Sequence, residues 1–227
     1  TGNLTDSPTA ATQAGYNPDW ADAAGKVVTP AGTLPVTVTG PARWMTDQAG
    51  ARVWARPVTT TTYDNGEPAK LNPDSGQPYR LVTKTVASTI TQGASDWETH
   101  DVVSTTLTSY DGLASDGTTT GWKLGQPTAV TTDMDNSGTL TAGDITRETV
   151  YDAQGRVVQQ RQPSAQGKAA DPGTRVTIDY TAGNNVDACQ KTEWIGLVCT
   201  TGPGAGTQLP VEKTLDYTWD QRPAKTQ

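Results

Sequence analysis

The residues at 133–144 carry oxygen-bearing side chains at the alternate positions from which a loop can bind a calcium ion. Carboxylates stand at positions one, three and twelve of this stretch, hydroxyl groups stand at five, seven and nine, and Gly138 stands at six, where the chain must turn sharply. The expected metal ligands are Asp133, Asp135, Ser137, the carbonyl of Thr139, Thr141 and Asp144. The spacing predicts a bound Ca²⁺ ion; the alternative is an acidic turn whose aspartates bond only to backbone amides.

The segments on either side of this loop determine what a bound ion would do. Residues 127–132 and 145–151 are rich in Thr, Val and Ile and alternate in polarity, which is typical of strands. The loop resembles the calcium loops of EF-hand and dockerin proteins, although Asp144 stands where EF-hands carry a longer glutamate. EF-hand loops join helices, whereas this one is expected to join strands. We therefore expect structural Ca²⁺ that stiffens a connection rather than a calcium sensor.

The composition predicts an all-β chain. Its 227 residues include 23 Gly and 15 Pro, which interrupt long helices, and they include no Phe, so that 7 Tyr and 7 Trp supply all the aromatic surface. The abundant Thr and Val favour pleated, half-buried surfaces. Hydrophobic residues make up only 33% of the chain, and we therefore expect a thin or extended β architecture rather than one thick core.

The charge excludes two classes of partner. A net charge of −7 and a pI near 4.6 argue against nucleic acid, whose phosphates require a basic face, and against anionic membrane surfaces. No apolar stretch reaches the roughly 18 to 20 residues of a membrane span, and the first residues lack the order of a signal peptide. The chain is therefore expected to be an excised or processed piece with no membrane span.

A second signal is the recurrence of a Tyr-Asp pair at the end of strand-like runs. Complete pairs stand at Tyr63-Asp64, Tyr110-Asp111 and Tyr151-Asp152, and degenerate ones at Asp179-Tyr180 and Asp216-Tyr217. The sharpest copy continues from Asp152 to Gly155 and Arg156. We expect the tyrosine to pack at the strand end, Asp152 to cap the turn, Gly155 to supply a positive φ and Arg156 to begin the return strand. Each copy thus predicts a β-hairpin.

The copy at 151–163 resembles the YD repeat of the RHS (rearrangement hotspot) family. The resemblance implies successive antiparallel hairpins that form a curved, spiral sheet, a segment of the hollow shell found in teneurin-like proteins. It implies as partners the remaining YD repeats and a toxin or effector cargo domain elsewhere in a parent chain. Residues 61–227 are expected to form the repeat region, with the calcium loop at 133–144 inserted, and residues 1–60 an N-terminal β-rich segment with weaker echoes.

The two cysteines bear on the compartment. Cys189 and Cys199 bracket Trp194, and a disulfide could close this short span; the alternative is a pair of free buried thiols. A metal site is not expected, because two thiols without neighbouring His or Cys cannot complete a tetrahedral shell. Similar loops occur in actinobacterial RHS chains, to which the resemblance extends. An oxidised pair implies a secreted or cell-surface protein.

No pattern of catalytic residues stands out, and the chain is not expected to be an enzyme. His100 is the single histidine, and paired carboxylates such as Asp96 and Glu98 could serve glycoside hydrolysis only if the fold set their separation. The alternative function is an extracellular β-sandwich module that binds carbohydrate or a cell-surface partner through exposed aromatic rings. The candidate rings are Trp20, Trp44, Trp54, Trp97 and Trp122, for which packing in the core is the competing role. A shell segment should instead expose edge strands and tend to self-associate.

Overall fold

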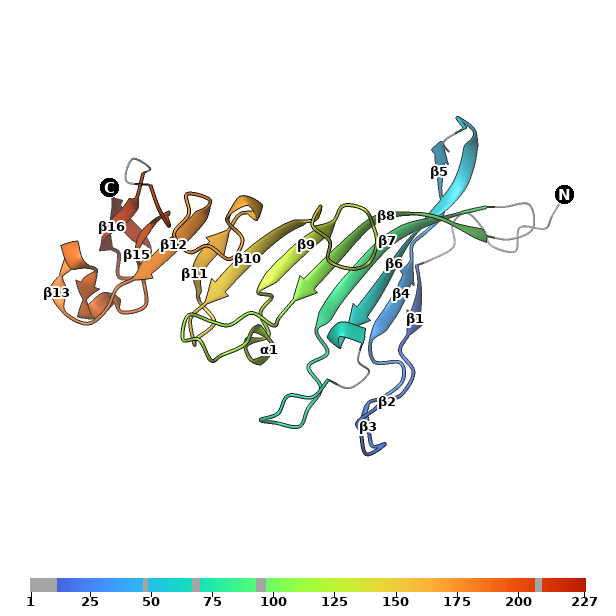
Figure 1. Ribbon diagram of the computed structural model, residues 1–227, viewed down its shortest axis with the longest axis horizontal. Helices are drawn as coiled ribbons and strands as arrows, with labels where there is room; N and C mark the ends of the chain where they lie inside the picture. Colours follow the sequence, from blue (N-terminus) through green and yellow to red (C-terminus); the bar gives the residue numbers. More distant parts are fainter. Residues whose placement is uncertain (1–11, 47–48, 67–69, 93–96, 207–209) are drawn as a thin grey trace. The chain divides into compact units, whose positions relative to one another are not determined.

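The computed structural model describes residues 12–46, 49–66, 70–92, 97–206 and 210–227, and it describes their side chains except at 97–101. Strands dominate (Figure 1). In chain order they are β1 (Gln13–Tyr16), β2 (Trp20–Ala21), β3 (Val27–Thr29), β4 (Pro35–Thr39), β5 (Arg43–Thr46), β6 (Arg52–Tyr63), β7 (Val82–Gln92), β8 (Trp97–Ser109), β9 (Ala129–Asp133), β10 (Ile145–Tyr151), β11 (Val157–Arg161), β12 (Thr174–Asp179), β13 (Asn184–Asn185), β14 (Gln190–Lys191), β15 (Val198–Pro203), β16 (Glu212–Tyr217) and β17 (Pro223–Thr226). Helical turns are short: η1 (Asp64–Gly66), α1 (Gly121–Leu124), η2 (Pro163–Ala165), η3 (Val186–Ala188) and η4 (Thr192–Trp194).

The described strands form one large antiparallel sheet and two small ones, which confirms the all-β expectation. Thirteen strands share the large sheet, in the order β1-β4-β6-β7-β8-β9-β10-β11-β12-β15-β16-β17, with β5 beside β6. The pairs β2-β3 and β13-β14 form the two-stranded sheets. Most neighbours in the large sheet follow one another in the chain, as successive hairpins require. No described sheet curls on itself, so the spiral form stays a prediction.

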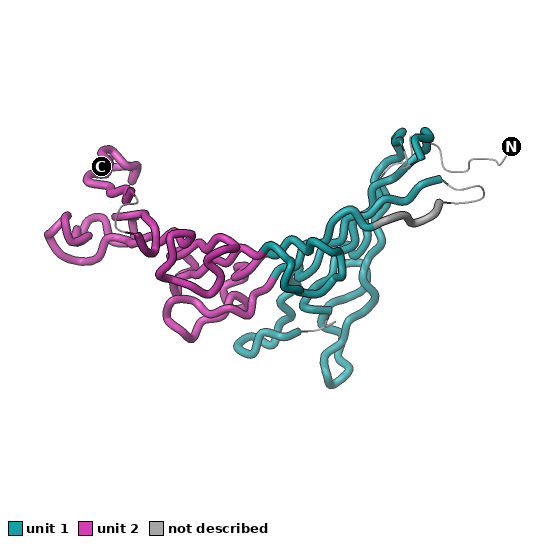
Figure 2. The backbone as a smooth tube through the Cα atoms, turned by 45° about the horizontal axis from the view of Figure 1, so that its top comes forward, with its two compact units in different colours: residues 1–108, 131–145 teal, residues 109–130, 146–227 magenta. Residues whose placement is uncertain are grey.

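The chain divides into two compact units, shown in two colours in Figure 2. The first comprises residues 1–108 and 131–145, and the second comprises residues 109–130 and 146–227. The loop at 133–144 therefore belongs to the first unit, and the disulfide and the hairpins from β10 onward belong largely to the second. The expected boundary at residue 60 stays a division made from the repeat pattern.

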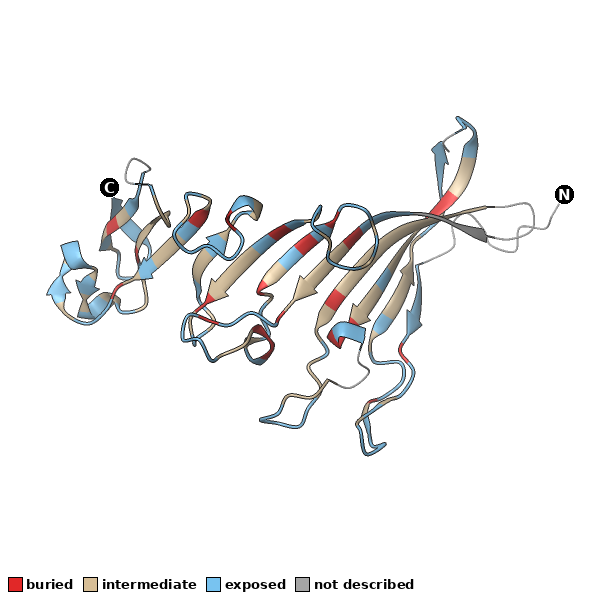
Figure 3. Ribbon diagram, viewed as in Figure 1, coloured by how far each residue is buried: buried red, intermediate tan, exposed pale blue. Residues whose placement is uncertain are grey.

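Most buried side chains are aromatic, small or hydroxyl-bearing. Among the described residues, no Val, Leu, Ile or Met side chain is buried, whereas Tyr63, Tyr110, Tyr151 and Tyr180 are. The buried polar residues are mostly threonines, and the hydroxyls of Thr83, Thr128 and Thr174 donate to backbone carbonyls. Figure 3 shows buried residues as short separate bands along the strands. This pattern agrees with the low hydrophobic content, because a single sheet offers few fully enclosed positions.

Within the described part of the chain, six hairpins close with the same backbone register. The closing pairs are Tyr16–Pro35, Ala21–Val27, Tyr63–Val82, Tyr151–Val157, Asp179–Val198 and Tyr217–Pro223. In each hairpin the register shifts between the first member of the pair and the residue before it. That preceding residue pairs with the residue two positions after the second member, as Val150 pairs with Gln159. The backbone amide of the residue after the first member donates to the carbonyl of the residue before the second member, at 2.8 to 3.0 Å. We call the first member of each pair the closing residue.

Candidate metal centre and repeat hairpins

The loop between β9 and β10 brings three carboxylates together. Asp133 ends β9 and is 2% exposed, Asp135 is exposed and Asp144 is half-buried beside the start of β10. One oxygen from each of the three carboxylates lies within 4.8 Å of the other two. The strands thus place the first and last members of the expected ligand set, as a loop between strands should.

Backbone amides hold the first carboxylate in place. Asp133 accepts hydrogen bonds from the amide of Ser137 at 3.2 Å and from the amide of Gly138 at 2.7 Å. Positive φ angles of 54° at Asn136 and 78° at Gly138 turn these amides inward. Asn136 also carries a buried side-chain oxygen without a hydrogen-bond partner. The loop is therefore a tight anionic turn with one orphaned oxygen acceptor.

The last carboxylate ties the two ends of the loop together. Asp144 accepts from the amide of Met134 at 2.9 Å through one oxygen and from the amide of Thr141 at 2.7 Å through the other. The third carboxylate is also held, because Asp135 accepts from the Ser137 amide at 3.0 Å. A side-chain hydrogen bond from Ser137, supported by its backbone amide, lowers the pKa of the Asp135 carboxyl below its usual value. All three carboxyl groups thus accept hydrogen bonds from backbone amides of the loop.

The donor set fits a hard divalent cation. Calcium binds oxygens at 2.3 to 2.6 Å, so two ligands on opposite sides of one ion are about 4.6 to 5.2 Å apart. The three carboxylate oxygens lie no more than 4.8 Å from one another, which is close enough for all three to contact one such ion. Ser137 and Thr139 lie at the same turn, where the Ser137 hydroxyl donates to the Thr139 carbonyl at 2.9 Å. The hydroxyl and carbonyl oxygens expected as further ligands are therefore local to the three carboxylates, while their coordination stays a prediction.

The tyrosines of the Tyr-Asp pairs link neighbouring strands. The Tyr63 hydroxyl donates to the carbonyl of Pro35 at 3.0 Å, and the Tyr151 hydroxyl donates to the carbonyl of Pro127 at 2.9 Å. Pro35 is the first residue of β4 and Pro127 lies just before β9, so in both cases a tyrosine at the end of a strand reaches the start of the neighbouring strand in the sheet. The Tyr217 hydroxyl does the same to Val198, the first residue of β15, at 2.6 Å. Burial raises the pKa of the Tyr63 and Tyr151 hydroxyls, which keeps them protonated as donors.

The aspartates cap the turns as expected. One oxygen of Asp152 accepts from the amides of Gln154 and Arg156, both at 2.9 Å, and Gly155 has a φ of 82°. In the longer connection after β6, the Asp64 carboxylate accepts from the amides of Arg80 and Leu81 at 3.1 and 3.0 Å. A carboxylate beside the closing residue can therefore close both a tight turn and a long insertion.

The pair Tyr110-Asp111 is built differently. The Trp122 indole nitrogen donates to Asp111 at 2.6 Å, and the Tyr110 and Trp122 rings lie with centroids 4.9 Å apart. Trp122 belongs to the short helix α1, whose N-terminus is capped by the Thr120 hydroxyl. Here the aspartate fixes an inserted helical turn. Trp122 is thus buried packing and does not offer an exposed ring.

Sequence reasoning missed two copies in the N-terminal segment. Asn17, after the closing residue Tyr16, accepts from the amides of Thr33 and Leu34 at 3.1 and 2.8 Å, as Asp64 does in its own hairpin. Asp22 accepts from the amides of Ala24 and Lys26 at 3.0 and 2.9 Å, as Asp152 does. The spacing from Asp22 to a glycine three residues later and a basic residue after it was a visible signal.

The last copy is shifted by one residue from its expected position. Tyr217 is the closing residue, and Thr218 takes the place of the capping aspartate, because its hydroxyl accepts from the Arg222 amide at 3.1 Å. Gln221 stands at the glycine position with a φ of 62°. The motif therefore runs forward from Tyr217, whereas Asp216 remains inside β16.

Cys189 and Cys199 are joined in a disulfide, with an S–S distance of 2.05 Å and Cα atoms 5.5 Å apart. Cys199 is fully buried. The Trp194 ring between them packs edge-on against Tyr180 and Tyr217, with centroids 5.1 and 5.5 Å away. The loop closed by the disulfide thus contributes Trp194 to an aromatic cluster with tyrosines of the last two hairpins.

The remaining candidates divide into packed and exposed groups. Trp44 and Trp54 stack with centroids 4.1 Å apart, and Trp20 packs 6.2 Å from Tyr63. The side chains of Trp97, Glu98 and His100, and the whole of Asp96, lie outside the described residues. Trp219, which the sequence did not single out, is 96% exposed. Among the described residues no helix is long and apolar enough to cross a membrane.

Comparisons with known proteins add no identity: no family model, no curated protein and no solved structure matches the chain.

Proposed function

We propose that this chain is a non-catalytic structural segment of a secreted YD-repeat shell, which encloses or presents a toxin or effector domain located elsewhere in a parent chain. The observation that carries the proposal is the common register and turn hydrogen bond of six hairpins. Unrelated hairpins have no reason to share a bulge at the same position relative to the turn. The shared closure therefore supports one repeating unit, as the resemblance of residues 151–163 to the YD repeat implies.

The character of the sheet supports a wall rather than a binding module. Among the described residues, there is one large sheet and two sheets of two strands each. A β-sandwich requires two facing sheets whose inner sides are apolar. Here no described Val, Leu, Ile or Met side chain is buried, and tyrosine hydroxyls bond to the backbone at the start of the neighbouring strand. Such a sheet is held together along its own plane, as a wall must be.

The calcium loop has a structural role in this proposal. A bound Ca²⁺ would supply positive charge that offsets the mutual repulsion of Asp133, Asp135 and Asp144. These residues already orient their carboxylates through amide hydrogen bonds, so the chain contributes a preformed anionic turn. The cation would then stiffen the connection between β9 and β10. The disulfide, in turn, supports an exported location.

Electron cryo-microscopy of the native polypeptide that carries residues 1–227, purified from its source, tests the proposal. The expected result is a sheet of repeated hairpins that encloses a cavity with a separate domain inside. A closed sandwich without further repeats would overturn it. A sugar-dependent change in Trp fluorescence of the isolated chain would instead support the binding-module alternative.

A further inference from the structure

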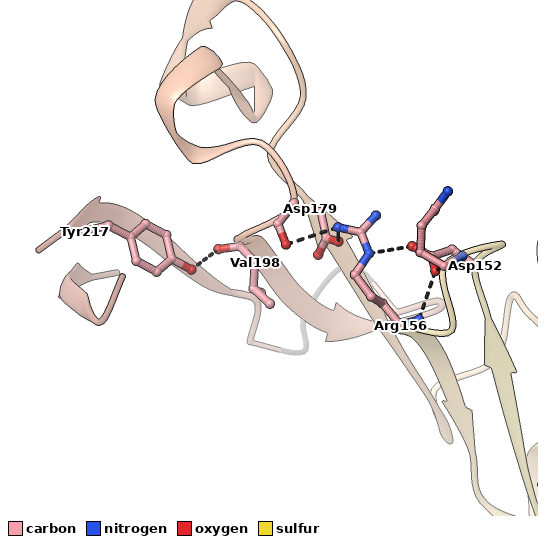
Figure 4. Close-up of polar contacts among 7 residues, drawn as sticks. Asp152, Arg156, Asp179, Val198 and Tyr217 are labelled. Atoms are coloured by element: carbon pink, nitrogen blue, oxygen red, sulfur yellow. Dashed lines mark hydrogen bonds and ion pairs between the residues drawn. The ribbon is translucent and has the colours of Figure 1, made fainter. Parts of the chain in front are cut away.

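One arginine connects two consecutive hairpins in the second unit. The guanidinium of Arg156 lies 2.7 Å from the carboxylate of Asp152 in its own turn and 2.8 Å from the carboxylate of Asp179 (Figure 4). It also donates to the carbonyl of Gly196 at 3.1 Å. Asp179 and Gly196 belong to the next hairpin, formed by β12 and β15, and Asp179 is its closing residue. The arginine of one repeat therefore contacts the closing residue of the following repeat.

The last hairpin places Arg222 at the position that Arg156 occupies in its own hairpin. Tyr151 pairs with Val157 and the preceding residue pairs with Gln159; Tyr217 pairs with Pro223 and the preceding residue pairs with Lys225. The turn hydrogen bond ends on the carbonyl of Arg156 in one hairpin and on that of Arg222 in the other. Both arginines thus directly precede the return strand of hairpins with the same register.

The surroundings of the two arginines differ in their acidic partners and in their exposure. Asp179 contacts Arg156, whereas the described acidic partner of Arg222 is Asp220 of its own turn, at 3.0 Å. The Arg222 side chain is 82% exposed, compared with 45% for Arg156. Among the described residues, β17 pairs only with β16, so its other edge presents backbone donors and acceptors. Beside β17, Arg222 therefore holds the position from which Arg156 contacts Asp179 of the next hairpin. Among the described residues, no carboxylate of another hairpin contacts Arg222.

We propose that β17 and Arg222 form a strand-addition site for a β-hairpin whose closing residue is an aspartate or glutamate. The first strand of that hairpin pairs antiparallel with β17, as β12 pairs with β11, and its carboxylate meets Arg222. Backbone hydrogen bonds supply affinity, and the charge pair fixes the register and selects the partner. The inference deepens the proposed function and rests on it, because it treats the hairpins as repeating units.

Charge also distinguishes this partner from a second copy of the same chain. The first edge of the described sheet is β1, whose closing residue is Tyr16. A head-to-tail contact between β17 and β1 of another copy would place a tyrosine where the carboxylate is needed. Of the six closing residues, only Asp179 is acidic. The site therefore favours a partner of the β12–β15 type over self-association.

A peptide with the sequence of residues 174–203, oxidised at its two cysteines, is the probe for this site. It is titrated in trans against the full chain, with peptide anisotropy and amide hydrogen exchange of β17 as readouts. We expect saturable binding and slower exchange at β17. Arg222→Glu should weaken binding at least about tenfold, because it places two negative charges together. A peptide carrying Asp179→Arg should restore binding to that variant.

The control is Arg147→Glu, which reverses the same charge at an exposed position of β10 and should leave binding unchanged. A second measurement removes any limit set by affinity: residues 162–203 are duplicated after Gln227, and exchange at β17 is compared with and without Arg222→Glu. The inference is overturned if β17 gains no protection in either format. It is also overturned if Arg222→Glu and Arg147→Glu behave alike.

The two proposals fail separately. A hollow shell in the micrographs together with charge-independent peptide binding would remove the role of Arg222 and leave the shell. Charge-dependent strand addition in a native protein without a shell would remove the shell and leave the role of Arg222.

Discussion

Replacement of Asp133 by asparagine is the sharpest test of the proposed calcium site. The substitution keeps one oxygen acceptor for the loop amides and removes the charge of the most buried carboxylate in the triad. It loses one of the two capping hydrogen bonds that Asp133 accepts. That loss costs about 0.5 to 1.5 kcal/mol, and it does so with or without calcium. The diagnostic quantity is therefore the difference in stability between calcium and EDTA solutions.

The size of this difference follows from mass action. A ligand that binds only the folded protein at about 100 times its Kd adds about 2.7 kcal/mol to the free energy of unfolding. In a chain of 227 residues, each kcal/mol raises Tm by about 2 to 4 °C. The wild-type chain should thus melt roughly 5 to 11 °C higher in calcium than in EDTA. In Asp133→Asn most of this shift should disappear, because an amide oxygen can contact calcium but lacks the negative charge that makes a carboxylate a strong ligand.

Calorimetric melts of both proteins in millimolar calcium and in EDTA make the comparison. Asp116→Asn is the matched control, because Asp116 also caps a turn by accepting from the amides of Thr118 and Thr119. Among the described residues, it belongs to no cluster of metal-binding groups. The control should keep the full calcium-dependent shift. Equal melts of the wild-type chain in the two solutions, or a shift that survives Asp133→Asn, would refute the calcium assignment.

Three further predictions concern the hairpins. Tyr151→Phe should lower the free energy of unfolding by about 1 kcal/mol in urea titrations, because it deprives a backbone carbonyl of its donor; Tyr16→Phe, at a closing residue that is 54% exposed, should change little. Joint replacement of Cys189 and Cys199 by serine should cost about 3 kcal/mol, as expected for a cross-link across 10 residues, and equal urea midpoints would contradict this. A hydrogen bond from a threonine hydroxyl, with backbone amides, holds the pKa of Asp116 well below its usual range. Its contribution to stability is then present above the ordinary aspartate pKa and is lost as pH falls, so Asp116→Asn should flatten the acid side of a pH-stability profile.

Local chemistry explains which parts of the site could be predicted from the sequence. The turn from Asp152 to Arg156 depends on contacts between residues at most four positions apart, and its cap and positive φ agree with expectation. The same holds for the spacing of the carboxylates at 133–144. The missed copies show the limit of reading residue types. Asn17 and Thr218 do the work expected of aspartate, because the turn requires an oxygen acceptor and not a charge.

The sequence by itself determined the all-β class, the turns and the positions of the cysteines, since these follow from β propensity, glycine and proline placement and short-range hydrogen bonding. Only the tertiary structure decided which distant groups meet. Tyr151 reaches a carbonyl 24 residues away, and Arg156 reaches a carboxylate in another hairpin. Such partners depend on the register and order of neighbouring strands, which no local pattern encodes. Arg222 follows Tyr217 by five residues, as Arg156 follows Tyr151. For the same reason only the structure showed that Arg222 stands beside an edge strand with its guanidinium exposed.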